Sequence, residues 1–218
     1  MKWKCISGIG IGLLASLVIA RGAKNARQLE LRRETVVIPD LPAPFDGYRL
    51  LHLTDLHLRR HTTRGDELLA LVDAVQPDLV CLGGDYAFTA LSLREVEAFM
   101  TRLVARGPAV GIYGNADYRR DMLPGYRRRL AALLPFLHNT ALPLARDGAR
   151  LWLAGVDDPH KWRDDLDAAL REVPADVPVI LLAHSPDIIT RPLDPRLRLI
   201  LCGHTHGGQV RFPLLGPV

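Results

Sequence analysis

The segment RLLHLTDLHLRRHTTRGDELLALVDAVQPDLVCLGGD, residues 49–85, contains two apolar runs on either side of an amphipathic stretch. RLLHLTD and DLVCLGGD have the length and composition of buried strands, whereas DELLALVDAV between them has the apolar spacing of a helix. This order predicts a parallel strand-helix-strand unit. Each expected strand ends in a carboxylate, at Asp55 and at Asp85.

The same alternation continues along the chain. A helix is expected over residues 92–107, with Ser92 as its N-cap and a glycine at its end, and a strand is expected over 109–115. Similar patterns predict a basic helix around 119–132, a strand at 150–155, a helix near 164–171, and strands at 177–183 and 197–202. Strands alternating with helices predict an α/β fold, in which ligands bind beyond the carboxyl ends of the strands.

The composition is that of an ordinary globular domain. The 218 residues are 48% hydrophobic and 24% charged, with a net charge of +4. The basic residues are mostly spread out and aromatic residues make up 6%, which argues against a nucleic-acid groove with stacking aromatic side chains. Cys5, Cys81 and Cys202 are an odd number within apolar runs, so buried free thiols are expected rather than a disulfide framework.

The N-terminal segment CISGIGIGLLASLVIA, residues 5–20, carries no charge. As a helix it would cover about 24 Å of a hydrocarbon core about 30 Å thick, so Trp3 and snorkelling basic side chains would complete the span. We expect a retained membrane anchor, and a cleaved signal peptide with an exported domain is the alternative. Basic residues are more numerous after the apolar run, where Arg21, Lys24 and Arg27 follow directly, than before it. By the positive-inside rule, this excess predicts that the domain lies on the cytoplasmic side.

These observations predict three segments along the chain. Residues 1–22 form the anchor or signal segment, residues 23–34 form a polar linker, and residues 35–218 form the catalytic domain.

Metal-binding side chains gather at the expected strand ends. These side chains are Asp55 and His57, Asp85, Asn115, His184, and His204 with His206. Because the carboxyl ends of parallel strands meet at one edge of a sheet, the seven side chains are expected to converge on a metal site. Gly203, Gly207 and Gly208 in GHTHGGQ (203–209) indicate sharp turns or a close approach of the backbone to another group.

The types of ligand indicate how many ions the site holds. Mixed oxygen and nitrogen ligands without a thiolate suit Mn²⁺, Fe or Zn²⁺, and seven donors are too many for one tetrahedral zinc. We therefore expect two divalent ions, about 3.5–4 Å apart, that share a bridging carboxylate and activate water for attack on phosphorus. This chemistry predicts hydrolysis of a phosphate ester.

Five short motifs resemble, in order, those of the calcineurin-like metallophosphoesterases. They are DLH (55–57), GGD (83–85), GNAD (114–117), AHSPD (183–187) and GHTHGGQ (203–209). The resemblance covers residues from about 45 to about 213 and is strongest to the membrane-associated bacterial branch of the YkuE/YaeI type. It implies a four-layer α/β/β/α sandwich and a place at the bacterial inner membrane.

The resemblance also implies roles for the seven side chains. Asp55, His57 and His206 would hold one ion, Asn115, His184 and His204 would hold the other, and Asp85 would bridge them. Asp85, Asn115 and His204 are the candidate catalytic residues.

One residue departs from the family pattern within a motif. Ala116 stands where the family has a histidine that assists the leaving group. A positioned acid contributes about 10²- to 10⁴-fold to a rate, so esters with alkoxide leaving groups are expected to be poor substrates. Together with the anchor, Ala116 favours a phosphodiester or pyrophosphate substrate, such as a lipid-linked nucleotide like UDP-diacylglucosamine, which membrane-anchored members of this branch hydrolyse.

A second departure is the short C-terminal segment FPLLGPV. Members of the family continue with further strands after the last motif, so the C-terminal edge of one sheet is expected to be incomplete. Ala116 and this edge leave an alternative function, a catalytically weak or inactive metal-binding protein tethered to a membrane. Metal-dependent turnover separates the two functions.

Several other residues lie close to the motifs. Arg119 and Arg120 are candidate phosphate-binding residues because guanidinium matches phosphate bidentately, and a solvated helix face is the alternative. Asp117 is expected to shape its loop, and Asp157 with Asp158 to form a turn before a proline, with a place in the lining of the pocket as the alternative. No motif includes His52, His61, His138 or His160, which are interpreted as structural or surface residues, with a place near the site as the alternative for His61 and His160.

Overall fold

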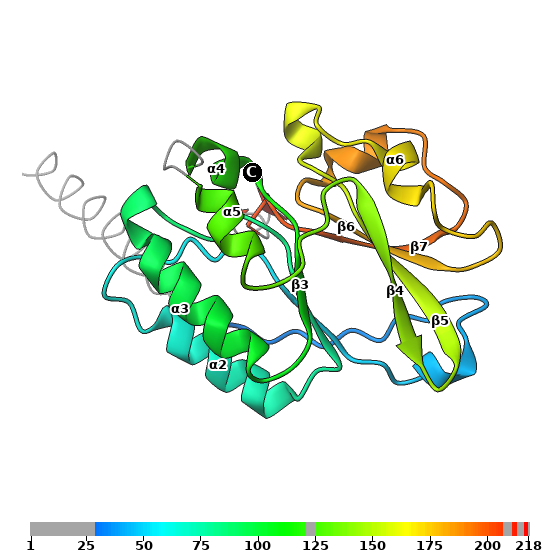
Figure 1. Ribbon diagram of the computed structural model, residues 1–218, viewed down its shortest axis with the longest axis horizontal. Coiled ribbons are helices and arrows are strands. Elements are labelled where there is room, and N and C mark those ends of the chain that lie inside the picture. The colour runs from blue at the N-terminus through cyan, green and yellow to red at the C-terminus, as the bar shows by residue number, and fades with distance from the viewer. Residues whose placement is uncertain (1–28, 121–124, 207–210, 213–215, 218) are drawn as a thin grey trace, which may run out of the picture. The chain divides into compact units, whose positions relative to one another are not determined.

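The computed structural model describes residues 29–120, 125–206, 211–212 and 216–217 (Figure 1). The chain divides into two compact units, residues 1–37 and 38–218, and every helix and strand described here belongs to the second unit. The expected anchor over residues 1–22 lies outside the described residues. In the part of the chain that the structure describes, no helix has both the length and the apolar character needed to cross a membrane.

The first sheet contains the strand-helix-strand unit expected from residues 49–85. Its strands are β1 (Leu50–Leu53), β2 (Leu79–Leu82) and β3 (Ala109–Gly111), which pair in parallel in this order. Parallel strands need crossover connections, which α2 (Arg64–Val75) and α3 (Leu93–Val104) provide. The two helices lie side by side (Figure 1).

The second sheet has the order β4-β5-β6-β7. These strands are Thr140–Arg146, Ala149–Gly155, Val179–Ala183 and Leu197–Cys202. β4 and β5 form an antiparallel hairpin, while β5, β6 and β7 pair in parallel. The hairpin turns at Asp147 and Gly148, both at positive φ, as a two-residue turn that matches the strand twist requires. A short antiparallel pair, β8 (Arg211–Phe212) and β9 (Gly216–Pro217), completes the described strands.

The basic helix expected around residues 119–132 is not one continuous helix. The structure has two shorter helices, α4 (Asn115–Arg120) and α5 (Tyr126–Ala131). Gly125 precedes α5 with a φ of +75°, a left-handed conformation that a continuous right-handed helix does not contain. The first of the two helices, α4, begins earlier than expected, directly at the candidate ligand Asn115.

The ends of the other helices differ in smaller ways. The helix expected over 92–107 is α3, and Ser92 occupies its N-cap position without a side-chain capping hydrogen bond. The helix expected near 164–171 is α6 (Leu166–Leu170), whose N-cap Asp165 accepts a hydrogen bond from the Ala168 N–H. The described residues also include the 3₁₀ helices η1 (Ala43–Phe45), η2 (Ala90–Ser92), η3 (Pro159–Lys161) and η4 (Pro186–Thr190).

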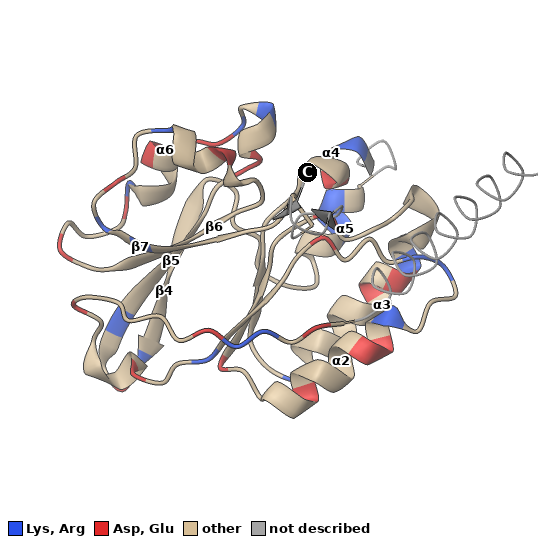
Figure 2. Ribbon diagram, turned by 180° about the vertical axis from the view of Figure 1, so that it is seen from behind, with Lys and Arg blue, Asp and Glu red and all other residues tan. Residues whose placement is uncertain are grey.

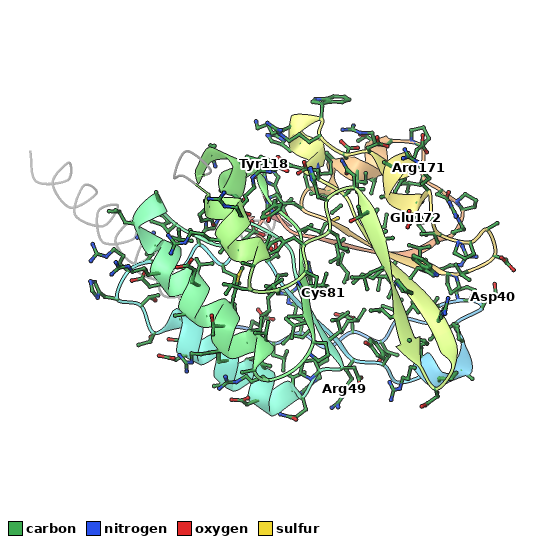
Figure 3. The ribbon with its side chains drawn as sticks, in the orientation of Figure 1. Asp40, Arg49, Cys81, Tyr118, Arg171 and Glu172 are labelled. Carbon is green, nitrogen blue, oxygen red and sulfur yellow. The ribbon has the colours of Figure 1, made fainter. Side chains whose placement is uncertain are left out.

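The two sheets share a hydrophobic core. One buried cluster combines side chains of both sheets: Leu79, Cys81, Val110 and Ile112 from the first, and Leu151, Leu153, Ile180 and Leu182 from the second. A second cluster joins β5, β6 and β7 to α6 and η4. Figure 3 labels Cys81 within this interior. Cys81 is a buried free thiol, as expected, whereas the free thiol Cys202 is only partly buried and Cys5 lies outside the described residues. Acidic and basic residues are interspersed over α2 and α3 (Figure 2).

Candidate metal centre

All seven candidate ligands follow strands at their carboxyl ends, as expected from the sequence. Figure 1 shows the ends of β3, β6 and β7 converging near α4. Backbone hydrogen bonds beyond the strands fix the segments to one another: the Asp55 N–H donates to the Gly84 carbonyl (3.0 Å), and the Gly203 N–H donates to the His184 carbonyl (2.9 Å). The backbone thus holds each ligand segment against its neighbour in the sheet.

One group of ligand atoms comes from Asp55, His57 and His206. An atom from each lies within 4.8 Å of the atoms of the other two. His206 Nε2 is 3.4 Å from Asp55 Oδ1, and the His57 and His206 rings stack with their centroids 5.2 Å apart. A carboxylate and two imidazoles therefore face one point.

Asp85 lies between this group and the next. Its Oδ2 atom is 3.7 Å from His57 Nε2 and 3.7 Å from His184 Nε2. Asp55, Asp85 and His184 also offer atoms that all lie within 4.8 Å of one another. This is the position that a carboxylate bridging two ions must occupy.

Asn115, His184 and His204 form the other side of the site. One terminal atom of the Asn115 amide lies 3.1 Å from His184 Nε2 and 3.0 Å from His204 Nδ1. The two imidazole rings are 5.2 Å apart at their centroids. All seven residues predicted from the sequence are therefore brought together at one edge of the two sheets.

The hydrogen bonds around the site leave ligand atoms available for a cation. Asp55 Oδ2 accepts from the His204 N–H (2.8 Å) and the Thr54 hydroxyl (2.8 Å), while the buried Oδ1 atom has no hydrogen-bond partner. His184 Nδ1 lies 2.8 Å from the Gly83 carbonyl, so this nitrogen donates and Nε2 offers its lone pair to the site. The donor set fits divalent ions that accept mixed oxygen and nitrogen ligands.

Backbone strain is concentrated in the same residues. Asp55, His57, Asp85, His204 and His206 all have positive φ, between 39° and 69°. Such values are costly for residues other than glycine and persist where the surrounding structure imposes them, commonly at functional sites. At these residues the chain departs from regular strand geometry, directly after the strands end.

Two glycines allow the ligand segments to approach closely, and Gly203 was expected to do so. A Cβ atom on Gly203 would overlap Thr54, and one on Gly114 would overlap Asp85 and His184. Gly207 and Gly208 lie outside the described residues.

Asp117 is buried beneath the site and joins its segments. Its Oδ2 atom accepts from the backbone N–H groups of Asp85 (2.8 Å) and Gly114 (2.9 Å), and its Oδ1 atom from Tyr86 N–H (3.2 Å) and the Tyr126 hydroxyl (3.0 Å). Burial, together with the nearby Asp85 carboxylate, raises the pKa of Asp117 to about 6. Asp117 shapes the loop, in agreement with expectation.

The surroundings of His204 favour the neutral form of its imidazole. Burial, and then the neighbouring His184 and His160, lower the pKa of His204. A neutral imidazole is the form that binds a metal ion, so this environment favours ligation.

Of the two candidate phosphate-binding arginines, the structure places the side chain of Arg119. Its Nη2 atom lies 3.1 Å from the Asn115 amide, on the terminal atom that points away from the imidazoles. The Arg119 side chain is exposed beside the site. The side chain of Arg120 lies outside the described part of the structure.

The loop after β5 contributes residues that the sequence favoured as turn or surface residues, with a place near the site as the alternative. The His160 ring lies 4.8 Å from the His204 ring, and its Nδ1 atom is 3.2 Å from Asp187 Oδ2. Asp158 accepts the His160 N–H as a turn residue, but it is fully buried, its Oδ2 atom has no partner, and burial raises its pKa. The available signal was that GVDDP follows a strand at the same edge as the motifs.

Asp157, in the same loop, binds to α4 and to the segment before β4. The Tyr118 hydroxyl donates a hydrogen bond to its carboxylate, and His138 Nδ1 lies 3.1 Å from Asp157 Oδ2. Figure 3 shows Tyr118 on the side of the structure where this loop lies. Asp157 thus fixes the loop that carries Asp158 and His160.

Comparison with known proteins agrees with this site. The chain is 32% identical to the phosphodiesterase YaeI of Escherichia coli, over 85% of this chain and 69% of that protein. It is also 32% identical to a transmembrane protein with a metallophosphoesterase domain from Bos taurus, over 83% of this chain and 45% of that protein. The chain spans 64% to 69% of the length of three bacterial relatives that it matches.

A solved structure shares the fold. The NAD nucleotidase of Haemophilus influenzae superimposes with a TM-score of 0.52 at 18% identity, over 72% of this chain and 38% of that one. The family model of the calcineurin-like phosphoesterases matches residues 48–208, a range that includes all seven candidate ligands. The chain therefore belongs to the calcineurin-like phosphoesterase family.

Proposed function

We propose that the chain is a dinuclear metal-dependent phosphohydrolase that cleaves phosphodiester or pyrophosphate bonds. The observation that carries this proposal is the position of Asp85, whose Oδ2 atom is 3.7 Å from an imidazole of each ligand group. Asp55, His57 and His206 would hold one ion, and Asn115, His184 and His204 would hold the other. Asp85 would be shared between them.

Two divalent ions, Mn²⁺, Fe²⁺ or Zn²⁺, would supply an activated water and the positive charge that offsets the charge growing on the phosphoryl oxygens. The chain's own residues fix the geometry in which this happens. The Gly83 carbonyl orients His184, and the Thr54 hydroxyl orients Asp55. Arg119 and Arg120 bind the phosphate, and His204 borders the reacting group.

The residue at position 116 narrows the substrate class. Ala116 is buried, and its N–H donates to Asp85 Oδ1 (2.7 Å), so the position supports the bridging carboxylate but offers no proton to a leaving group. A substrate whose leaving group departs as a stable anion needs no such proton. A pyrophosphate in a lipid-linked nucleotide meets this requirement, and the name phosphodiesterase carried by the relative YaeI agrees with a diester.

The proposal also includes a membrane anchor and the architecture of the domain. Residues 1–22 anchor the chain in a membrane, supported by the uncharged segment 5–20 and by relatives named as transmembrane proteins. The domain is a four-layer sandwich, supported by the core shared between the two sheets and by the second core between the sheet and α6.

A second candidate function is favoured by Ala116. A chain that binds ions without assisting the leaving group could serve as a membrane-tethered metal-binding protein with little turnover. The ligand set is the same in both cases, so only turnover distinguishes them.

The experiment is a substrate panel with the full chain in detergent, after chelation and after addition of Mn²⁺. The panel holds bis(4-nitrophenyl) phosphate, 4-nitrophenyl phosphate, a simple alkyl phosphate and UDP-diacylglucosamine. We expect turnover only with Mn²⁺, fastest on the diester or the pyrophosphate. Faster hydrolysis of the alkyl monophosphate would contradict the substrate class, and no turnover by a folded, ion-loaded chain would support the second function.

A further inference from the structure

We propose that ion binding releases Arg119 from Asn115 and so makes its guanidinium available to the phosphate of the substrate. This inference rests on the proposed function and deepens it, because it adds an order of events to the site. Asn115 and Arg119 are four residues apart on α4, the spacing at which side chains on a helix meet.

The Asn115 amide faces two different sets of neighbours. One terminal atom lies 3.0 Å from His204 Nδ1 and 3.1 Å from His184 Nε2, and the other lies 3.1 Å from Arg119 Nη2 and 3.3 Å from the Ala116 N. Ring nitrogens can accept hydrogen bonds, whereas a guanidinium and a backbone N–H only donate them. The two ends of the amide therefore require opposite chemistry.

Without ions, hydrogen bonding selects one orientation of the amide. The structure records Asn115 Oδ1 toward His184 Nε2 (3.1 Å). If the amide is turned over, its nitrogen can donate to the two imidazoles and its oxygen can accept from Arg119. The recorded orientation, the reverse of this one, places the oxygen against two acceptors and the nitrogen against two donors, so all of these contacts are lost. In the turned-over state Arg119 is tied to the ligand residue.

Ion binding requires the reverse orientation. An amide binds a divalent ion through its oxygen, because the conjugated nitrogen has no lone pair to offer. The oxygen must then lie on the side of His184 and His204, and the amide nitrogen turns toward Arg119. Two donors face each other, so the guanidinium leaves Asn115.

The released guanidinium is suited to the substrate. Arg119 is exposed beside the site and can form paired hydrogen bonds with phosphate oxygens. Asn115 therefore serves either the ion or Arg119, and the two bindings compete. If ion binding weakens the contact between Arg119 and Asn115 by a given factor, linkage requires that this contact weakens ion binding by the same factor. Removing the Arg119 side chain must therefore strengthen ion binding by that factor.

The test measures Mn²⁺ affinity by calorimetry on the chelator-treated full chain. Arg119→Met removes the donor, and Arg128→Met is the control, because Arg128 is an exposed residue of α5 and its loss removes an equal charge. We expect Arg119→Met to bind Mn²⁺ about 5- to 10-fold more tightly than wild type, and Arg128→Met to differ by less than about 2-fold. Equal effects of the two substitutions would overturn the inference.

A second measurement uses inorganic phosphate as the probe. With Zn²⁺ bound, Arg119→Met should weaken phosphate binding about 10-fold relative to Arg128→Met, and without Zn²⁺ the two variants should bind phosphate alike. A similar loss in both states would show that Arg119 is available without ions and would overturn the inference. A wild-type chain that binds no ions would instead overturn the proposed function.

Discussion

Gly114 lies where the backbone of one ligand segment touches the side chains of two others. A Cβ atom at this position would meet Asp85 Oδ1 and would come within 2.7 Å of His184 Cε1. These atoms belong to Asp85 and His184, which are both candidate ligands. If either side chain moved to make room for a Cβ atom, the two groups of candidate ligands would move apart. The absence of a side chain at residue 114 is therefore a requirement of the site.

The Gly114→Ala variant should weaken Mn²⁺ binding by 10-fold or more and destabilise the fold by about 1–3 kcal/mol, because the added methyl group overlaps Asp85 and His184. Calorimetry and urea unfolding measure the two effects. Gly107→Ala is the control, since a Cβ atom there meets nothing within 4 Å. Unchanged ion affinity in Gly114→Ala would contradict the described geometry.

His52 on β1 supplies a pH-dependent contribution to stability. Burial lowers the pKa of His52 to about 4, so between about pH 4 and pH 6.5 the unfolded chain binds a proton that the folded chain does not. Stability then rises with pH across this window and is lost as the pH falls from about 6.5 to 4. The shift corresponds to about 3 kcal/mol at full extent.

The His52→Leu variant should have a shallower dependence of unfolding free energy on pH than wild type between pH 4.5 and 6.5. Urea unfolding of the chelator-treated chain measures it, since chelation excludes loss of ions from the other histidines. His61→Ala, at an exposed histidine, should keep the wild-type slope. Identical slopes in all three proteins would show that His52 is not the source.

At the scale of single residues, the sequence indicated which candidate ligands lie together, but not the contacts of the loop after β5. The seven candidate ligands could be identified because each follows an apolar run that was expected to be a strand. Their places in the sequence therefore indicated that they lie at the carboxyl ends of the strands. His160 and Asp187 meet only through the packing of two loops, which no local pattern encodes. The unpartnered oxygen of Asp158 is likewise visible only in three dimensions.

At the scale of elements, the side chain of Asp117 joins the end of β2 to α4 and α5. Its two oxygens accept four hydrogen bonds from these segments. Because two of the donors are backbone groups at the edge of the candidate site, the position of Asp85 and Gly114 depends on this carboxylate.

The Asp117→Asn variant should lower the free energy of unfolding by about 2–3 kcal/mol, because an amide nitrogen would face buried donors. It should also weaken Mn²⁺ binding, since the Asp85 and Gly114 segments lose a shared support. Thermal unfolding and calorimetry test both effects, with the exposed Asp176→Asn as the control. Wild-type behaviour of Asp117→Asn would contradict the supporting role.

The strands of high apolar content were predictable, and β4 was not. Residues 140–146 are half-exposed, contain Pro143 and lie at the edge of the second sheet, so they lack the continuous apolar run of a buried strand. The division of the strands into two sheets followed from the family resemblance, because pairing between distant strands depends on packing that a local pattern does not specify.

At the scale of the whole domain, the candidate site draws on both sheets. Asp55, Asp85 and Asn115 follow strands of the first sheet, whereas His184, His204 and His206 follow strands of the second. Ions bound by all of them would cross-link the two sheets through the site. Ion binding should therefore stabilise the native state as a whole.

Mn²⁺ at about 100 times its dissociation constant should stabilise the wild-type chain by about 2.7 kcal/mol per site, because only the native state brings the ligands together. Thermal unfolding with and without Mn²⁺ measures this effect. Asp85→Asn should lose most of the stabilisation, whereas Asp176→Asn should keep it. An equal rise in Tm in wild type and Asp85→Asn would place the bound ions elsewhere.

The most direct test of the central claim is a titration of Mn²⁺ into the chelator-treated full chain while the hydrolysis of bis(4-nitrophenyl) phosphate is followed. We predict no turnover without ions, a rise that is complete only after two ions per chain, and no turnover at any ion concentration in Asp85→Asn. Turnover that survives chelation, or that Asp85→Asn retains, would contradict a dinuclear metal centre at this site.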